Sequence, residues 1–217
     1  MATKRSQRIG IWIISIAMVV GTIGGFIAMM VAPGNEKREQ AALEAAQKEW
    51  TAAQEAQAQK LSDKHYETFS PFASRVGEFS AEGIDELKTE DLVVGDGDEV
   101  KDDTPVAMYY IGWNPTGIVF DQSINDGKLK APLAVADGPA NASVIEGWQK
   151  GLVGMKIGGV RELTIPSAMA YGETGQGDDI PANTPLKFVV MAISPVEEVP
   201  MPQILKDYYK RLYGTDF

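Results

Sequence analysis

The sequence contains no cysteine and a single histidine, His65. Without cysteine the chain has no disulfide, no thiolate metal site and no cysteine nucleophile. His65 has no second ligand-type residue placed to complete a metal site, so we predict neither a metal nor any other cofactor and interpret it as a surface residue. These absences count against most hydrolases and metalloenzymes.

Basic clusters are also missing. The chain has 20 Lys and Arg residues against 30 Asp and Glu residues, and its formal net charge is -10. Binding to nucleic acid requires clustered basic side chains that neutralise phosphates, so we predict no nucleic-acid partner. The acidic run between Asp96 and Asp103 lacks the spacing and the closing Glu of an EF-hand calcium loop, and we interpret it as a solvated turn.

Long apolar runs are absent except at residues 10–32, which carry no charge. As a helix this run is long enough to cross a hydrocarbon core of roughly 30 Å. Lys4, Arg5 and Arg8 precede it, which predicts a cytoplasmic N-terminus at residues 1–9 and an extracytoplasmic remainder. A secretory signal peptide would have a shorter apolar region ending in a small-x-small cleavage site, and Val31-Ala32-Pro33 matches this poorly. We expect a single-pass membrane protein that contacts the lipid bilayer through residues 10–32; whether this segment is ever cleaved stays open.

Residues 33–85 are predicted to form a helical stalk and a connector. The stretch from Glu36 to about Lys64 is rich in Ala, Gln, Glu and Lys and contains no Gly or Pro, which favours a helix. Leu43 and Trp50 are seven residues apart, but Gln57 breaks the heptad, so we expect a solvated stalk rather than a coiled coil. In the connector, residues 68–84, we expect the aromatic side chains to pack against the edge of the following domain.

Residues 86–197 have the pattern of an α+β domain. Runs rich in β-branched and aromatic residues, at 106–110, 159–165 and 186–193, predict strands, and Gly- and Asn-rich segments separate them. An amphipathic helix fits residues 145–153, so we predict an antiparallel sheet that closes over one short helix. The C-terminal extension, residues 198–217, has an apolar and aromatic helical pattern that stops at Gly214, and we expect it to pack back on the domain or the stalk.

Several motifs in this domain occur together and in order. The central string is VIEGWQKGL at residues 144–152, followed by GMKIGG at 154–159 and LTIP at 163–166. AYG at 170–172 and IPANTPLKF at 180–188 continue the series, and YIG at 110–112 with FDQS at 120–123 precede it. Together these motifs resemble those of the FKBP-type peptidyl-prolyl cis/trans isomerases, from roughly residue 86 to residue 196. The resemblance implies a curved antiparallel β-sheet wrapped around one short α-helix, with the active pocket between them.

The resemblance also implies the site residues. The family's catalytic positions fall on Tyr110, Phe120, Asp121, Tyr171 and Phe188. Its substrate-binding positions fall on Leu133, Val144, Ile145, Trp148 and Ile180. Trp148 would form the floor of the pocket, and the Ile145 N–H and the Tyr171 hydroxyl would hold substrate carbonyls. Leu133 stands at a position where the family frequently has an aromatic residue, and Gln176 stands where members have a loop histidine. Both differences are expected to affect the turnover rate and the sequence preference.

The activity implied by the resemblance is isomerisation of X–Pro bonds in proline-containing client polypeptides, in support of extracytoplasmic protein folding. Rotation about this bond meets a barrier of about 18–20 kcal/mol, and an apolar pocket can favour the twisted form without a covalent intermediate. Macrolides of the rapamycin type would be inhibitors. An FKBP-like chaperone or peptide-binding module with little turnover is the alternative. A third hypothesis, a membrane scaffold that dimerises through Gly21 and Gly25, uses their GxxxG spacing.

Overall fold

The computed structural model describes residues 36–135 and 137–214. The predicted cytoplasmic segment 1–9 and membrane helix 10–32 lie outside these residues. Within the part that is described, no helix combines the length and the apolar character needed to cross a membrane. The chain forms two compact units, one spanning Ala58–Glu197 and the other containing the described residues up to Gln57 and from Glu198 onward.

The long helix α2 spans Glu36–Phe69, as predicted but about one turn longer. It stops two residues before Pro71, which disfavours a helical conformation in the residue that precedes it. A 3-10 helix, Ser70–Arg75, follows. Near the end of α2, Ser62 and Phe69 are buried, and the Leu129 N–H donates a hydrogen bond of 2.8 Å to the Ser62 hydroxyl.

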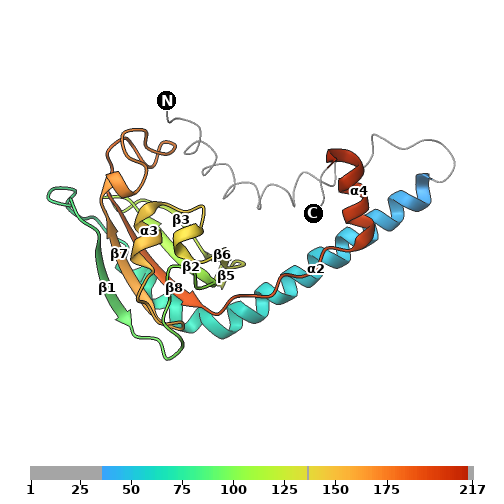
Figure 1. The fold of residues 1–217 in the computed structure, drawn as a ribbon, viewed down its shortest axis with the longest axis horizontal. Helices are drawn as coiled ribbons and strands as arrows, with labels where there is room; N and C mark the ends of the chain where they lie inside the picture. Colours follow the sequence, from blue (N-terminus) through green and yellow to red (C-terminus); the bar gives the residue numbers. More distant parts are fainter. Residues whose placement is uncertain (1–35, 136, 215–217) are drawn as a thin grey trace. The chain divides into compact units, whose positions relative to one another are not determined.

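The larger unit is built on an antiparallel sheet (Figure 1). Its strand order is β1 (Lys88–Val93), β7 (Val160–Ile165), β8 (Leu186–Ile193), β2 (Val106–Trp113) and β3 (Val119–Gln122), with β6 (Leu133–Val135) also paired to β2. The short strands β4 (Ile124–Asn125) and β5 (Lys128–Leu129) form a separate hairpin. Two further 3-10 helices lie at Pro139–Asn141 and Ser167–Met169. The predicted α+β class and three predicted strands are therefore confirmed.

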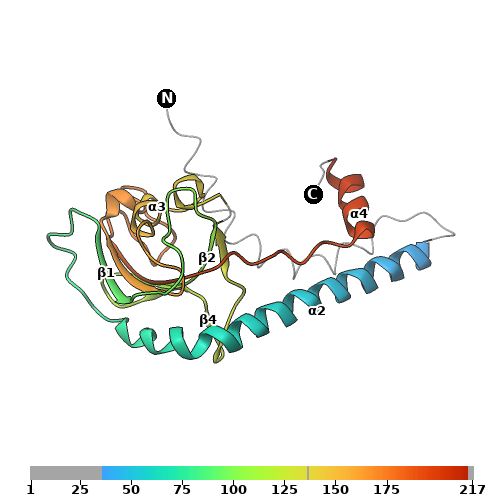
Figure 2. The same cartoon turned by 60° about the horizontal axis from the view of Figure 1, so that its bottom comes forward.

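Both faces of this sheet are covered (Figure 2). Alternate residues of β2 point to opposite sides, so Tyr110 packs in one apolar cluster with α3 (Glu146–Gly151), while Tyr109 and Trp113 pack in another. The second cluster includes Phe69 of α2 and the connector residues Phe72, Val76 and Phe79. The expected packing of the connector aromatics is confirmed. The compact unit begins at Ala58, whereas the sequence places the domain start at residue 86.

The interpretation of His65 as a surface residue is wrong. Because α2 continues past Lys64, its last turns lie on the sheet and the His65 ring is half-buried, with its centroid 6.0 Å from that of Tyr109. Burial lowers the pKa of His65, and the neighbouring Lys64 charge lowers it further. Among the described residues, no group of three or more His, Cys, Asp or Glu side chains could hold a metal ion.

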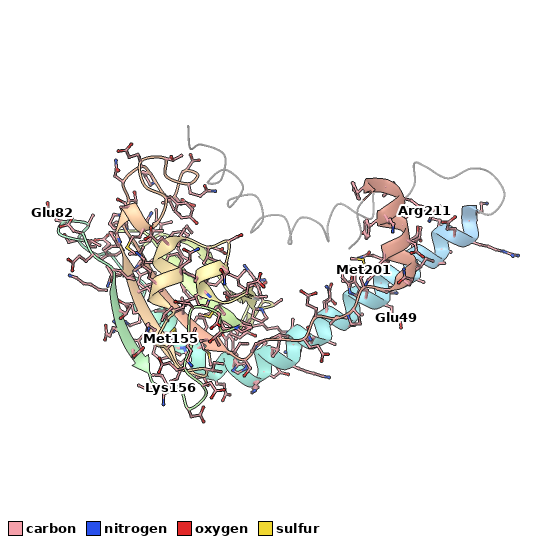
Figure 3. All side chains as sticks on the ribbon, in the orientation of Figure 1. Glu49, Glu82, Met155, Lys156, Met201 and Arg211 are labelled. Atoms are coloured by element: carbon pink, nitrogen blue, oxygen red, sulfur yellow. The ribbon has the colours of Figure 1, made fainter. Side chains whose placement is uncertain are left out.

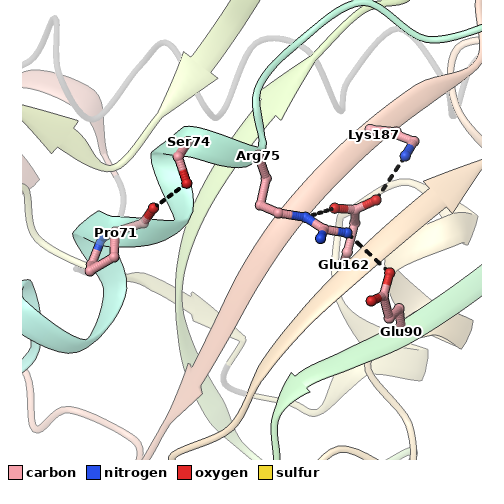
Figure 4. Close-up of polar contacts among 6 residues, drawn as sticks. All are labelled: Pro71, Ser74, Arg75, Glu90, Glu162 and Lys187. Carbon is pink, nitrogen blue, oxygen red and sulfur yellow. Dashed lines mark hydrogen bonds and ion pairs between the residues drawn. The ribbon is translucent and has the colours of Figure 1, made fainter.

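A buried carboxylate links the connector to the sheet (Figure 4). Glu162 of β7 accepts hydrogen bonds of 2.8 Å from Arg75 Nε and from Lys187 Nζ. Arg75 also donates to Glu90 of β1 at 3.1 Å. Burial alone would raise the pKa of Glu162, but the hydrogen bonds from Arg75 and Lys187 outweigh it and hold the pKa below its usual range.

The helix α3 is shorter than the predicted span of residues 145–153 and lies close against β7. A Cβ atom added to Gly147 would lie 2.3 Å from Ile165 Cγ2, so only glycine allows this approach. Met155, labelled in Figure 3, follows α3 and is buried in the same apolar cluster as Trp148 and Leu152.

In the smaller unit, α4 (Gln203–Tyr213) ends at Gly214, whose φ of 68° is left-handed, as the sequence predicts. Trp50 Nε1 of α2 donates to the Val199 carbonyl at 3.0 Å, and Arg211 of α4 pairs with Glu39 of α2 at 2.5 Å. Leu205 is buried. The expected packing of the extension on the stalk is confirmed.

Candidate active site

Four aromatic rings meet on the sheet face that α3 covers. Trp148 of α3 lies edge-to-face against Phe188 of β8, with centroids 5.4 Å apart, and against Tyr110 of β2, with centroids 5.2 Å apart. Phe120 of β3 packs edge-to-face on Phe188 at 5.5 Å. Edge-to-face pairs are a favoured arrangement of aromatic rings. Trp148 is only 4% exposed, and the four rings, all of predicted site residues, form one continuous aromatic surface.

Strand register brings these rings together, and Gly112 makes room for them. Gly112 is paired with Phe188 on one side and Asp121 on the other. The register shifts after Gly112, which leaves Phe120 as the extra residue of a β-bulge. A Cβ atom on Gly112 would lie 2.5 Å from Phe188 Cε1 and 2.8 Å from Phe120 Cε2. Sequence reasoning assigned Gly112 no role of its own, although a glycine inside a strand often marks a close approach.

The polar groups of the site are few. The Tyr110 hydroxyl donates a hydrogen bond of 2.6 Å to Asp121 Oδ2, and Asp121 Oδ1 accepts one of 2.8 Å from the Gln122 N–H. Burial raises the pKa of Tyr110, and the hydrogen bond to Asp121 and its charge raise it further. Burial also raises the pKa of Tyr171, again with the Asp121 charge. Both tyrosines therefore stay protonated at neutral pH and can act as hydrogen-bond donors.

The remaining predicted residues surround the aromatic rings. Ile180 is buried, and the partly buried side chains in the same cluster are Leu133, Val144, Ile145 and Tyr171. Asp121 joins the set through Tyr110. The structure thus brings all ten predicted residues together. Within the described part of the chain, neither the Tyr171 hydroxyl nor the Ile145 N–H has a hydrogen-bond partner, although their assigned roles with substrate stay predictions.

A closed loop connects two of these residues. The Gly175 N–H donates to the Tyr171 carbonyl at 3.2 Å, and the Gln176 N–H donates to the Ile180 carbonyl at 2.7 Å. Asn114 Nδ2 donates to the Asp179 carbonyl at 2.8 Å and so ties the loop to the β2–β3 turn. Asn114 is buried, and the sequence indicated only a turn at this position. Gln176 itself is exposed on the loop.

This arrangement suits selective binding of an apolar group. The aromatic surface can contact a compact ring such as proline, and a few protonated donors can orient neighbouring carbonyls. An apolar site of this kind favours a twisted amide over a planar one, because twisting reduces the charge separation of the amide.

Comparison with known proteins agrees with this chemistry. A model of the family described as FKBP-type peptidyl-prolyl cis-trans isomerase matches residues 97–193. The chain is 41% identical over 104 residues to an FK506-binding protein of Neisseria meningitidis serogroup A, a match that covers 48% of this chain and 91% of that protein. It is 43% identical over 108 residues to FK506-binding protein 4 of Rhizopus delemar, covering 50% of this chain but 27% of that one.

Among solved structures, the crystal structure of AtFKBP13 matches with a TM-score of 0.44 and 34% identity, over 51% of this chain and 93% of that one. The Neisseria protein is matched along nearly its whole length, whereas the Rhizopus protein extends well beyond the shared region. On the match to the Neisseria protein and to the family model, the chain belongs to the FKBP-type peptidyl-prolyl cis-trans isomerases.

Proposed function

We propose that the protein binds an X–Pro segment with the proline ring on the aromatic surface around Trp148, and isomerises the peptide bond there. The edge-to-face set of Tyr110, Phe120, Trp148 and Phe188 is the observation that carries this proposal. Catalysis requires only that the pocket bind the twisted amide more tightly than either planar isomer. Tyr171 and the Ile145 N–H are the proposed donors to substrate carbonyls, while Asp121 fixes Tyr110.

The proposed setting is outside the cytoplasm, with client proteins that fold near the membrane. Support comes from the uncharged run at residues 10–32 and the basic residues Lys4, Arg5 and Arg8 before it. A tether of this kind would raise the local concentration of the domain near emerging chains.

Macrolides of the rapamycin type are the proposed inhibitors of the same pocket. Relatives in Neisseria and Rhizopus carry names that describe them as FK506-binding proteins. An aromatic surface that takes a proline ring also suits the cyclic, apolar portion of such a ligand.

A second candidate function is that of a peptide-binding chaperone with little turnover. Leu133, in place of an aromatic residue, makes the pocket wall less aromatic, and the exposed Gln176 changes the loop beside it. Both differences would change the geometry in which a peptide is held more than the affinity for it, which favours binding with little turnover.

A refolding assay distinguishes the two candidates. Full-length protein in detergent is added to a substrate whose refolding is limited by proline isomerisation, a step that takes tens of seconds or more uncatalysed. Asp121→Ala removes the acceptor for the partly buried Tyr110 hydroxyl and is expected to lower kcat/KM about tenfold or more. Asp85→Ala, at an exposed position of the same unit, is the matched control. If the protein does not accelerate refolding, the isomerase proposal is wrong. Macrolide binding that persists in that case would favour the chaperone.

A further inference from the structure

Arg161 of β7 joins the edge of the sheet to the end of α3. Its side chain is 8% exposed. Arg161 Nη1 donates to the Gly151 carbonyl at 2.9 Å and to the Val153 carbonyl at 3.0 Å. Nε and Nη2 donate to the two carboxylate oxygens of Asp91 on β1, at 2.6 Å and 3.1 Å. One guanidinium group thus contacts both carboxylate oxygens of Asp91 on β1, the carbonyl of the last residue of α3 and a carbonyl just after it.

The helix α3 depends on such outside contacts. It has six residues, two of them glycine, and the residue before it, Ile145, provides no side-chain cap. Isolated helices shorter than about 12 residues are marginal in water, and the last carbonyls of any helix lack partners within it. A buried cation at the C-terminal end both satisfies these carbonyls and interacts favourably with the helix dipole.

Trp148 takes its position from this helix. It lies three residues before Gly151, in the middle of α3. Its indole Nε1 is buried and has no hydrogen-bond partner in the described part of the chain. The indole packs edge-to-face on Tyr110 and Phe188, but no hydrogen bond holds it in place. A shift of the α3 backbone therefore moves the ring as well.

We propose that Arg161 is a positioning residue of the active site: anchored by Asp91, it fixes the C-terminal end of α3 and thereby the depth of Trp148 in the pocket. The inference rests on the proposed isomerase function. Lysine cannot replace Arg161 here, because a single ammonium group lacks the planar fork that contacts two carbonyls and a carboxylate at once.

The test uses the full chain in detergent, labelled with fluorotryptophan, with the Trp148 resonance assigned from Trp148→Phe. Arg161→Lys and Arg161→Gln are expected to shift this resonance while the Trp113 resonance, from the opposite face of the sheet, stays in place. They are also expected to lower kcat/KM by about tenfold to a hundredfold, the usual cost of a misplaced site group. Asp91→Asn is expected to give a smaller change in the same direction.

Arg75→Gln is the matched control. Arg75 likewise contacts two carboxylates, Glu162 and Glu90 (Figure 4). It belongs to the connector, whose side chains pack on the sheet face opposite to α3. We expect this variant to lose stability without a change in the Trp148 resonance or in kcat/KM per folded molecule. If Arg161→Lys and Asp91→Asn leave the Trp148 resonance unmoved, the inference is wrong, whatever their activity. If the resonance shifts but wild-type protein shows no isomerase activity, the proposed function fails and the positioning role stands.

Discussion

At the scale of single residues, Gly112 sets how closely the site rings can lie. Its Cα–H side faces Phe188 and Phe120, and the space that a methyl group would need is already filled by their ring atoms. Because Gly112 is also paired with Asp121, a displacement at this position reaches the Tyr110 hydrogen bond as well.

Gly112→Ala is therefore expected to displace both rings. Overpacking of this kind lowers the free energy of unfolding by about 1–3 kcal/mol. Separately, we expect kcat/KM of the folded variant to fall about tenfold. Urea unfolding and the refolding assay measure the two effects. Gly77→Ala, where an added Cβ meets nothing within 4 Å, is the control. Equal activity of the two variants would contradict the assigned role of Gly112.

The sequence motifs predicted ten site residues, and the structure brings these side chains together. Gly112, Asn114 and Arg161 gained their roles only from the structure. Gly112 acts through the absence of a side chain. Asn114 and Arg161 donate to backbone carbonyls that are 8 or more residues away in the sequence. No local pattern reveals which carbonyl a side chain will reach.

At the scale of the elements, burial decided which strands could be predicted. β2, β7 and β8 are largely buried and were predicted, β2 and β8 from their apolar residues and β7 (VRELTI) from its β-branched ones. β1 (KTEDLV) is mostly exposed and has no such signal. The predicted helix ended at about Lys64, whereas α2 continues to Phe69. Its last turn is polar in sequence apart from Tyr66 and Phe69, and these side chains meet the sheet only in the folded chain.

The link between connector and sheet predicts a pH dependence of stability. The folded pKa of Glu162 lies below its usual range, so its contribution is present above about pH 4.5 and is lost as the pH falls toward the folded pKa. Glu162→Gln is expected to lower the free energy of unfolding by about 1 kcal/mol at pH 7, since Arg75 is partly exposed and screened. At pH 3 the difference from wild type should shrink.

Urea unfolding at pH 7 and pH 3 measures this effect. Glu90, whose side chain is 62% exposed, is the other partner of Arg75. Glu90→Gln is expected to change the free energy of unfolding little at either pH. A difference between Glu162→Gln and wild type that is the same at both pH values would contradict the proposed contribution.

At the scale of the whole molecule, the division into units could not be predicted from composition. The change from stalk to domain was placed at residue 86, where strand patterns begin, but the compact unit starts inside α2 at Ala58. A helix that continues from one unit into the next shows no break in sequence. Packing of Phe69 and the connector, not local propensity, fixes the boundary.

The net charge of -10 predicts a preference among substrates. The loop between Tyr171 and Ile180 carries three exposed acidic residues, Glu173, Asp178 and Asp179, and no basic one. Each is one or two residues from a site residue, so its Cα lies within about 8 Å of it, which is comparable to the Debye length at physiological salt.

We therefore expect peptides with Lys beside the X–Pro bond to have a kcat/KM about twofold to fivefold above those with Glu at low salt. The ratio of kcat/KM for Lys peptides to that for Glu peptides should fall toward one at 0.5 M salt, because the Debye length is then only about 4–5 Å. Asp178→Asn with Asp179→Asn should reduce the preference, and Asp96→Asn with Asp98→Asn, an equal charge change in another loop, should not. A preference unaffected by salt would exclude this explanation.

The exposed, charged strand β1 has a consequence for aggregation. It forms one edge of the sheet and presents Lys88, Glu90 and Asp91. An unpaired edge can recruit extended chains as additional strands, and charges along it discourage this pairing. A protein that meets unfolded polypeptides is especially exposed to such recruitment. The charges on β1 therefore discourage an extended polypeptide from pairing with this edge of the sheet.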